Sequence, residues 1–296
     1  KSGPIQTFKF MLKSNAVAEK EKAEVALQPF GVSGLVAIPV GSFQMGSSRR
    51  EQGRKSNETQ VQVIFNRPFA LAAKEVSNEE YQRFDKEHSS GTFRGAALNR
   101  ATQPAVSMTW ESAVQYCNWL SENEGLTAAY EENDDGWVLK RPVPTGYRLP
   151  FEAEWEYAAR YAGGTSEQKY PWGEAMPPKN ANLADKHAAK YLDQVLSTYS
   201  DAVSVSASVG KFTANELGLF DLAGNVREWC SDYYHIYSSR SSISLEEPMG
   251  PESGRHHVIR GSSWMDASMS KFRCSYRSYG EEAAKDLGFR VARYLD

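Results

Sequence analysis

Residues 217–229 have the sequence LGLFDLAGNVREW, which places Asp221 and Glu228 on either side of the tripeptide Ala-Gly-Asn. A turn at this tripeptide can direct backbone carbonyls inward, toward the two carboxylates. Carboxylate, amide and carbonyl oxygens are the ligands that Ca²⁺ prefers, in a flexible shell of about six to eight. The alternative is that both side chains only accept hydrogen bonds from amides of the turn. The residues alone leave both interpretations open.

The long loops predicted around this stretch need contacts that hold them in place. Beyond Gly163, the chain is dominated by Gly, Asn, Ser, Asp and aromatic residues, which predict short strands and long loops. Loops this long are uncommon in a compact domain unless something ties them down. Asn182 and Asp201 lie in the other loop stretch and offer the same kinds of oxygen atom. We therefore expect two oxygen-rich places at which these loops are held.

Composition excludes several classes of protein. Of the 296 residues, 41% are hydrophobic and 12% aromatic, enough to bury a sizeable core. The 34 Lys and Arg against 37 Asp and Glu give a net charge of −3, without the basic stripe of a nucleic-acid-binding protein. The longest apolar runs, such as residues 34–40, are far too short to span a membrane. No signal peptide is visible at Lys1, although a chain trimmed of one would look the same.

The cysteines and histidines show no pattern of a scaffold or metal centre. Three cysteines are too few for a disulfide framework, and the odd number leaves at least one thiol free or paired between molecules. Cys117 lies on an apolar helical face and Cys230 follows a turn, so both are expected in the core. The five histidines lack metal-ligand spacing, and His256 and His257 are expected to form a loop pair at the surface.

Strands and helices can be predicted for the first half of the chain. Residues 34–40 predict a strand, residues 41–46 predict a turn leading into a second extended piece, and residues 61–65 alternate like a strand. Three helices are predicted from their termini: one with a capping box of Ser77 and Glu80, one capped by Thr109 and stopped at Gly125, and one over residues 152–161 after Pro150.

Only one domain is predicted. No internal repeat or low-complexity linker divides the chain, so we assign residues 34–296 to one domain and residues 1–33 to a lead-in segment. Within the lead-in, residues 14–26 are rich in Ala, Lys and Glu and predict a short polar helix or a flexible segment.

An ordered set of short phrases carries a family resemblance over roughly residues 34–294. The phrases are AIPVGSFQMG (37–46), KEVSNEEY (74–81), GYRLPFEAEWEYA (146–158), YPWG (170–173), LGLFDLAGNVREW (217–229), IRGSSW (259–264) and LGFRV (287–291). In this order they resemble the formylglycine-generating enzyme, or sulfatase-modifying-factor, family. The resemblance implies an α+β fold with little regular secondary structure, related in outline to C-type lectins.

The resemblance also implies two structural calcium ions. The first would be held by the side chains of Asn182 and Asp201 and the carbonyls of Leu183 and Val203. The second would be held by the side chains of Asp221 and Glu228 and the carbonyls of Gly224 and Val226. Calcium that binds the folded loops and not the unfolded chain would stabilise them by mass action.

The resemblance fails at the family's catalytic centre. Its oxidases use two cysteines, five positions apart, just after the Arg-Gly-Ser phrase, where thiolates can hold copper(I) and engage a substrate thiol. Aligning residues 260–278 places Cys274 on the second cysteine and Met269 on the first. A thioether cannot form the thiolate or disulfide that this chemistry needs. The alignment therefore argues against conversion of a sulfatase cysteine to formylglycine, and no catalytic residue is assigned.

Two classes of function remain open. The first is a non-catalytic or regulatory module that binds a protein through the groove around Met269 and Cys274, with His256 and His257 at its rim. The second is an oxidoreductase that acts on another substrate, as in siderophore maturation or cysteine oxidation. Resemblance to single-domain bacterial members favours the first class, as an accessory regulator of type VI secretion upstream of a membrane-spanning threonine kinase. That implies a periplasmic or outer-membrane-associated protein, with the periplasmic part of the kinase as partner.

Overall fold

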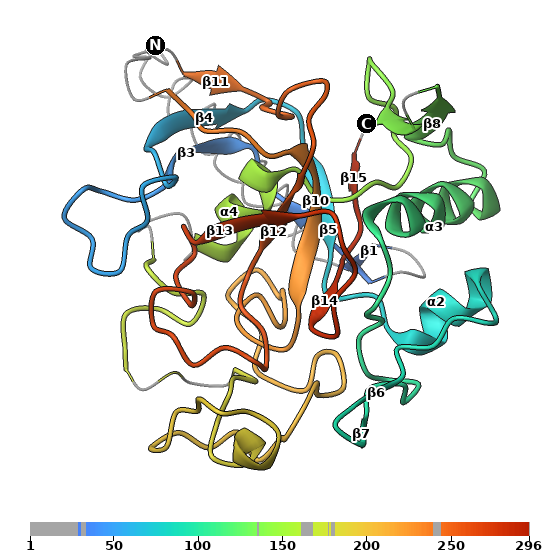
Figure 1. Cartoon of the computed structure of the whole chain (residues 1–296). Helices are drawn as coiled ribbons and strands as arrows, with labels where there is room; N and C mark the ends of the chain where they lie inside the picture. Colours follow the sequence, from blue (N-terminus) through green and yellow to red (C-terminus); the bar gives the residue numbers. More distant parts are fainter. Residues whose placement is uncertain are drawn as a thin grey trace, which may run out of the picture.

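The computed structural model describes residues 29–30, 34–134, 136–160, 168–176, 178, 181–238 and 244–295. Short strands and few helices are connected by long loops, which follow one another through most of the second half (Figure 1). The helix or flexible segment predicted within residues 14–26 lies outside the described residues. No described helix combines the length and apolar character required to cross a membrane.

One four-stranded sheet joins the two ends of the domain. Its order is β1 (Pro29–Phe30), β2 (Leu35–Ile38), β5 (Phe69–Ala72) and β15 (Ala292–Tyr294), and all neighbours are antiparallel. Every residue of β2 and β5 is buried, which agrees with the apolar run from which the strand at 34–40 was predicted.

A three-stranded sheet contains β3 (Gly41–Met45), β4 (Val61–Phe65) and β11 (Leu245–Glu246), with β4 in the middle. Strand β4 alternates buried and half-buried residues, as its sequence predicted. The turn expected over residues 41–46 is wrong in its position, because β3 begins at Gly41 itself and pairs with β4 along its whole length. The tyrosine hydroxyl of Tyr157 occupies the space where a Cβ at Gly41 would lie.

A second four-stranded sheet carries the segments of functional interest. Its order is β13 (Arg277–Gly280), β12 (His257–Arg260), β10 (Arg227–Tyr233) and β14 (Leu287–Gly288). Strands β12 and β10 are antiparallel, whereas β10 and β14 are parallel. Residues 261–276 form the loop between β12 and β13 and bring the chain back to pair with β12. Within this loop, Cys274 contacts Ala159 of helix α4 (Glu152–Arg160) and Arg260 of β12.

The predicted N-termini of the three helices are confirmed. The capping box of Ser77 and Glu80 starts α2 (Asn78–Phe84), and Thr109 caps α3 (Trp110–Asn123). Helix α4 ends at Arg160, and position 161 lies outside the described residues. The remaining short elements are β6 (Thr92–Phe93), β7 (Ala96–Ala97), β8 (Tyr130–Asn133), β9 (Gly136–Leu139) and the 3₁₀ turn η1 (Ala188–Lys190).

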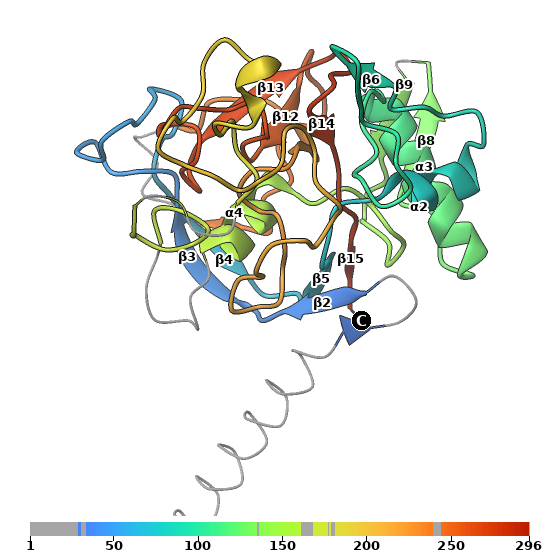
Figure 2. The ribbon, with the colours of Figure 1, turned by 90° about the horizontal axis from the view of Figure 1, so that it is seen from below.

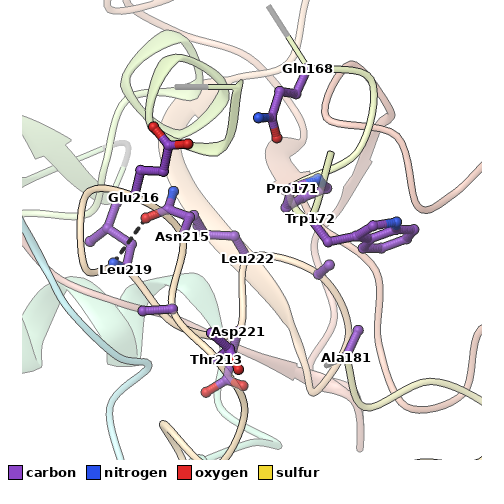
Figure 3. A pocket seen from close by; sticks show the side chains of 12 residues that line it. Gln168, Pro171, Trp172, Ala181, Thr213, Asn215, Glu216, Leu219, Asp221 and Leu222 are labelled. Carbon is purple, nitrogen blue, oxygen red and sulfur yellow. Dashed lines mark hydrogen bonds between the residues drawn. The ribbon is translucent and has the colours of Figure 1, made fainter. Parts of the chain in front are cut away.

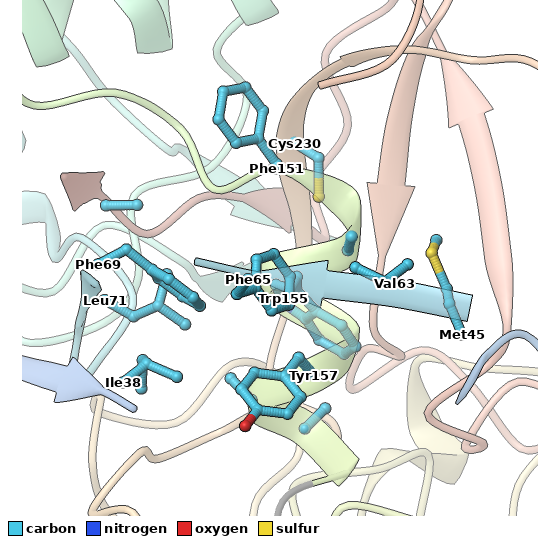
Figure 4. Close-up of a cluster of buried hydrophobic side chains, with 14 of the residues drawn as sticks. Ile38, Met45, Val63, Phe65, Phe69, Leu71, Phe151, Trp155, Tyr157 and Cys230 are labelled. Atoms are coloured by element: carbon cyan, nitrogen blue, oxygen red, sulfur yellow. The ribbon is translucent and has the colours of Figure 1, made fainter. Parts of the chain in front are cut away.

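Helix α4 lies at the centre of the largest apolar cluster, between strands β3, β10 and β12 (Figure 4). Helix α4 contributes the bulky side chains of Trp155 and Tyr157 to this cluster, and β4 contributes Phe65. The thiols of Cys117, Cys230 and Cys274 are free and buried, so the expected core positions of the first two are confirmed.

The same helix buries three carboxylates, each paired with a buried arginine. Arg148 forms a bidentate ion pair with Glu154 at 2.6 and 2.7 Å, Arg277 contacts Glu152 at 2.6 Å, and Arg260 contacts Glu156. A buried carboxylate without such a partner would be strongly unfavourable. The pairs with Arg260 and Arg277 therefore make the position of α4 depend on segments that are far away in the sequence.

We predict that Arg148→Met lowers the free energy of unfolding by about 3–5 kcal/mol, because it leaves the fully buried Glu154 carboxylate uncompensated. The matched control is Arg83→Met, which removes the exposed pair with Glu79 and should change stability by less than about 0.5 kcal/mol. Urea denaturation measures both. Equal losses in the two variants would contradict the role assigned to the buried pair.

Candidate functional site

Arg260, the last residue of β12, holds the loop of residues 261–276 in place. Its guanidinium donates to the carbonyls of Cys274 at 2.8 Å and Tyr276 at 2.7 Å, while it also pairs with Glu156 on α4. Arg273, near the same end of the loop, binds the buried Glu58 at 2.5 and 2.6 Å. Charge-assisted bonds therefore tie the last residues of the loop to Arg260, which precedes it, and to Glu58, although the loop contains no regular structure.

The structure places Cys274 and Met269 in different environments. The Cys274 thiol is completely buried, donates to the carbonyl of Ala159 at 3.4 Å, and has its pKa raised to about 12 by burial. It therefore stays protonated at neutral pH and is not a nucleophile. Met269 is 42% exposed at the surface of the loop. Two residues that jointly hold copper or form a disulfide must lie in contact, and this arrangement does not suit Met269 and Cys274.

A pair with the family's spacing does meet three positions earlier in the chain. Asp266 and Lys271 are five positions apart, and the Lys271 Nζ lies 2.5 Å from the Asp266 Oδ1. Burial alone would lower the pKa of Lys271, but the hydrogen bond and charge of Asp266 raise it above its usual value. Sequence reasoning missed this pair because neither residue is a cysteine, although the spacing after the Arg-Gly-Ser phrase could have revealed it.

The ion pair belongs to a larger polar network. The other carboxylate oxygen of Asp266 accepts from the backbone amide of Ser263 at 3.0 Å, and the hydroxyl of Ser263 donates to Asp286 at 2.7 Å. Asp286 in turn accepts two hydrogen bonds from Arg227, at 2.6 and 3.0 Å. The negative charges of Asp266 and Asp286 are therefore compensated by the positive charges of Lys271 and Arg227.

Arg227 also borders a surface groove of about 470 Å³ beside β13 and β14. Tyr279 is 50% exposed in this groove, with its ring 4.2 Å from that of Tyr234 and 5.0 Å from that of His256. His256 lies 2.8 Å from Glu281, which also accepts from Arg255. The groove thus combines an aromatic wall with charges of both signs, a surface suited to recognising another protein.

The expectation that His256 and His257 form a loop pair is wrong for His257. This residue lies in β12, where its ring is sandwiched between Trp110 at 3.6 Å and Tyr233 at 4.3 Å. Burial lowers its pKa to about 3, so the ring stays neutral. Successive residues of β12 are all buried because the strand is covered on both faces, and only His256 remains at the groove.

The residues of the first expected calcium set lie together. Asp201 accepts from the amides of Leu183 at 2.9 Å and Val203 at 2.8 Å, and the amide group of Asn182 donates to Val205 and Asn225. The Asn182 Oδ1 is buried and has no hydrogen-bond partner. An unpartnered buried acceptor is unfavourable unless an ion or another donor satisfies it. This set therefore fits an oxygen-ligated cation.

In the second expected calcium set, the carboxylates of Asp221 and Glu228 already accept hydrogen bonds from protein groups. Both oxygens of Glu228 accept from Arg290 at 2.7 Å, and one also accepts from Trp155 at 2.9 Å. Asp221 accepts from the amide of Gly210 at 2.6 Å and borders a separate cavity of about 260 Å³ (Figure 3). Burial raises the pKa of Asp221 to about 6. Thus Asp221 accepts from an amide outside the Ala-Gly-Asn turn and Glu228 accepts from Arg290 and Trp155, so these contacts differ from the amides of the turn that the alternative interpretation expected.

Glycine is required where the two sets meet. Gly224 adopts a φ of +81°, and a Cβ there would lie 2.2 Å from the carbonyl oxygen of Asn182. The amide of Asn225 donates to that same carbonyl at 2.8 Å. Val226 donates its amide to Glu75, a third buried carboxylate in this region. Within the described ranges, no cluster of three or more His, Cys, Asp or Glu side chains could hold a metal, so any cation would depend on amide and carbonyl oxygens as well.

We predict that a thiol reagent finds no accessible cysteine in the native protein and three after denaturation, because all three thiols are buried with raised pKa values. Lys271→Cys should add one thiol that reacts under native conditions, since the Lys271 side chain is 42% exposed. Native titration with a chromogenic disulfide measures both. Rapid reaction of one thiol in the unmodified protein would contradict the buried position of Cys274.

Known proteins are similar in sequence to most of this chain. Formylglycine-generating enzyme from Bos taurus is 30% identical over 87% of this chain and 74% of that protein. A bovine protein named inactive C-alpha-formylglycine-generating enzyme 2 is 29% identical over 87% of each. Serine/threonine-protein kinase pkn1 from Chlamydia caviae is 29% identical over 93% of this chain, which spans only 40% of the kinase.

Solved structures agree. Treponema denticola variable protein 1 superposes with a TM-score of 0.70 at 24% identity, covering 88% of this chain and 95% of that chain. PvdO from Pseudomonas aeruginosa superposes with a TM-score of 0.64 at 27% identity, covering 88% and 94%. A sulfatase-modifying factor enzyme 1-like domain matches residues 21–295. The chain therefore belongs to the formylglycine-generating enzyme, or sulfatase-modifying factor, family and has its α+β fold.

Proposed function

We propose that this chain is a non-catalytic member of its family, which binds a protein partner through the groove beside β13 and is stabilised by calcium. The observation that carries the proposal is the ion pair of Asp266 and Lys271 at the family's cysteine spacing. A carboxylate and an ammonium group can neither form a disulfide nor exchange with a substrate thiol. They can, however, hold the two parts of the loop together.

Several features support the loss of thiol chemistry. Cys274 is enclosed by the core and remains a neutral thiol, and the exposed Met269 cannot become a thiolate. The likeness to a bovine protein whose name calls it inactive is consistent with a family that contains non-catalytic members. The groove beside β13 has Tyr279, His256 and Arg227 along its walls, and its lining does not include Met269 or Cys274, around which the sequence had placed the binding groove.

Calcium binding is supported most strongly by the first set of residues. The buried Asn182 oxygen lacks a partner, and Asp201 lies against the two residues whose carbonyls complete the expected shell. Asn182 and Asp201 would hold the ion with the carbonyls of Leu183 and Val203. The second set is supported by charge, because Glu75, Asp221 and Glu228 surround the single guanidinium of Arg290. Such an ion would supply no chemistry beyond fastening the loops.

We predict that chelation lowers the melting temperature and that Asp201→Asn removes one equivalent of bound calcium, because the neutral amide is a weaker ligand. Asp193→Asn is the matched control, since its carboxylate is 93% exposed and outside both sets. Elemental analysis of calcium-equilibrated protein and thermal melts measure the two effects. A metal-free protein with no response to chelator would refute calcium binding.

The partner we propose is the extracytoplasmic part of a membrane kinase, which would make this chain a periplasmic regulator, for example of type VI secretion. The support is the likeness to a segment of proteins named as serine/threonine kinases, together with a groove whose aromatic and charged groups resemble an interface. The groove stands apart from the buried thiols, so recognition and thiol chemistry can be tested separately.

We predict that Tyr279→Arg abolishes capture of the partner while Cys274→Ser preserves it, because an exposed aromatic side chain can contribute about 2 kcal/mol or more at an interface. Melting temperatures confirm that each variant is folded. The measurement is pulldown of the kinase's extracytoplasmic domain from cell envelopes. Retained capture by the folded Tyr279→Arg protein would refute the groove as the binding surface.

The unmodified protein and the Cys274→Ser variant also test the alternative function, that of an oxidoreductase. The similarity to PvdO is the reason to test it. Incubation with a sulfatase-motif peptide, copper(I) and oxygen should leave the mass of the peptide unchanged. Formation of aldehyde well above background, with its loss in Cys274→Ser, would instead favour catalysis at the buried thiol.

A further inference from the structure

A separate cavity of about 680 Å³ gathers cations without carboxylates. Its lining comes from the loop that carries η1, from the hairpin of β6 and β7, and from residues 202–208. Arg100, Lys190 and Lys211 border it, and no aspartate or glutamate is among the described residues that line it. The three positive charges therefore reinforce one another within a single cavity.

Hydrogen bonds join the walls of this cavity to one another. The side-chain amide of Gln103 donates to the carbonyls of Ala97 at 3.1 Å and Ser206 at 2.7 Å, which joins the hairpin to the floor. On the side away from the cavity, two buried asparagine side chains hold the floor. Asn182 donates to the carbonyl of Val205, and Asn225 accepts from the amide of Ala207. The floor is thus held by buried amide groups and does not need to reorganise when a ligand binds.

The cations are available to a ligand. In the part of the chain that the structure describes, none of the three forms an ion pair: Lys190 lies 4.6 Å from the centre of the Tyr191 ring, and Lys211 lies 5.5 Å from that of Phe212. The lining is otherwise made mostly of Gly, Ala and Ser, which leaves the space open. A neutral ligand would leave the three charges uncompensated, whereas a polyanion would compensate them.

We propose that this cavity binds a small polyanion with at least two phosphate or other oxyanion groups. A guanidinium can contact one oxyanion group with two hydrogen bonds, and the two ammonium groups supply point charges for another. The hydroxyl of Ser204 is a further donor at the floor. The volume falls within the range of small-molecule sites. This site is distinct from the groove beside β13 and does not depend on the function proposed for it.

The probe is fructose 1,6-bisphosphate, titrated into the calcium-equilibrated protein at low salt by calorimetry, with fructose as the neutral comparison. The bisphosphate should bind and fructose should not. Lys190→Met with Lys211→Met should weaken binding roughly tenfold, because two charge-assisted contacts are lost. The control, Lys55→Met with Lys86→Met, removes the same charge at exposed lysines outside the cavity and should bind normally.

Melting temperatures establish that both double variants are folded. A disulfated disaccharide tests the source of the negative charge: equal binding supports recognition of oxyanion groups in general, and preference for the bisphosphate supports phosphate. Equal weakening in the two double variants would show that only net charge attracts the probe and would overturn the proposal. Failure of both the bisphosphate and the disulfated sugar to bind would overturn it as well.

Discussion

The buried carboxylates of helix α4 are the constraint on which the rest of the molecule depends. Glu152, Glu154 and Glu156 alternate along a nine-residue helix that is buried on every side. Buried carboxylates are tolerated only with well-placed partners, so the helix can occupy the core only if the arginines of the surrounding segments arrive as well. Two of these arginines come from β12 and β13, which flank the functional loop. Burial of the helix therefore requires that β12 and β13, and with them the two ends of the loop, are in place.

The long loops are organised by side chains bonded to backbone groups. Arg260 and Arg273 hold residues 261–276, while Asn182 and Asn225 join the two regions in which calcium was expected. Each of these side chains is buried and contacts more than one segment, so it replaces several hydrogen bonds that a regular sheet would have supplied. A fold can therefore be well defined with few helices and strands, as long as its buried polar groups are nearly all satisfied.

Local features of the structure could be predicted from the sequence, whereas features that depend on tertiary contacts could not. The cap at Ser77 and the alternation of β4 involve neighbours in the chain, and both were found as expected. His257 was misplaced because its burial results from Trp110 and Tyr233, more than 20 positions away in each case. The fold class was predictable because the family phrases contain the arginines and carboxylates that must pair. Whether calcium is bound was not, since the same oxygens serve amides, arginine or an ion.

Under the proposed function, the pair of Asp266 and Lys271 is where the scaffold keeps the shape of its loop without thiol chemistry. The ion pair holds Lys271 against Asp266, and the carboxylates of Asp266 and Asp286 accept hydrogen bonds from Ser263, so this part of the loop is held by charge-assisted bonds. The pair differs from two thiols in what it can do next, because thiols exchange bonds and electrons whereas a carboxylate and an ammonium exchange only a proton. The neighbouring network ends at Arg227 on the wall of the groove, so ion pairs hold that part of the wall. Under the proposed function, recognition at the groove therefore depends on this ion-pair network and not on thiol chemistry.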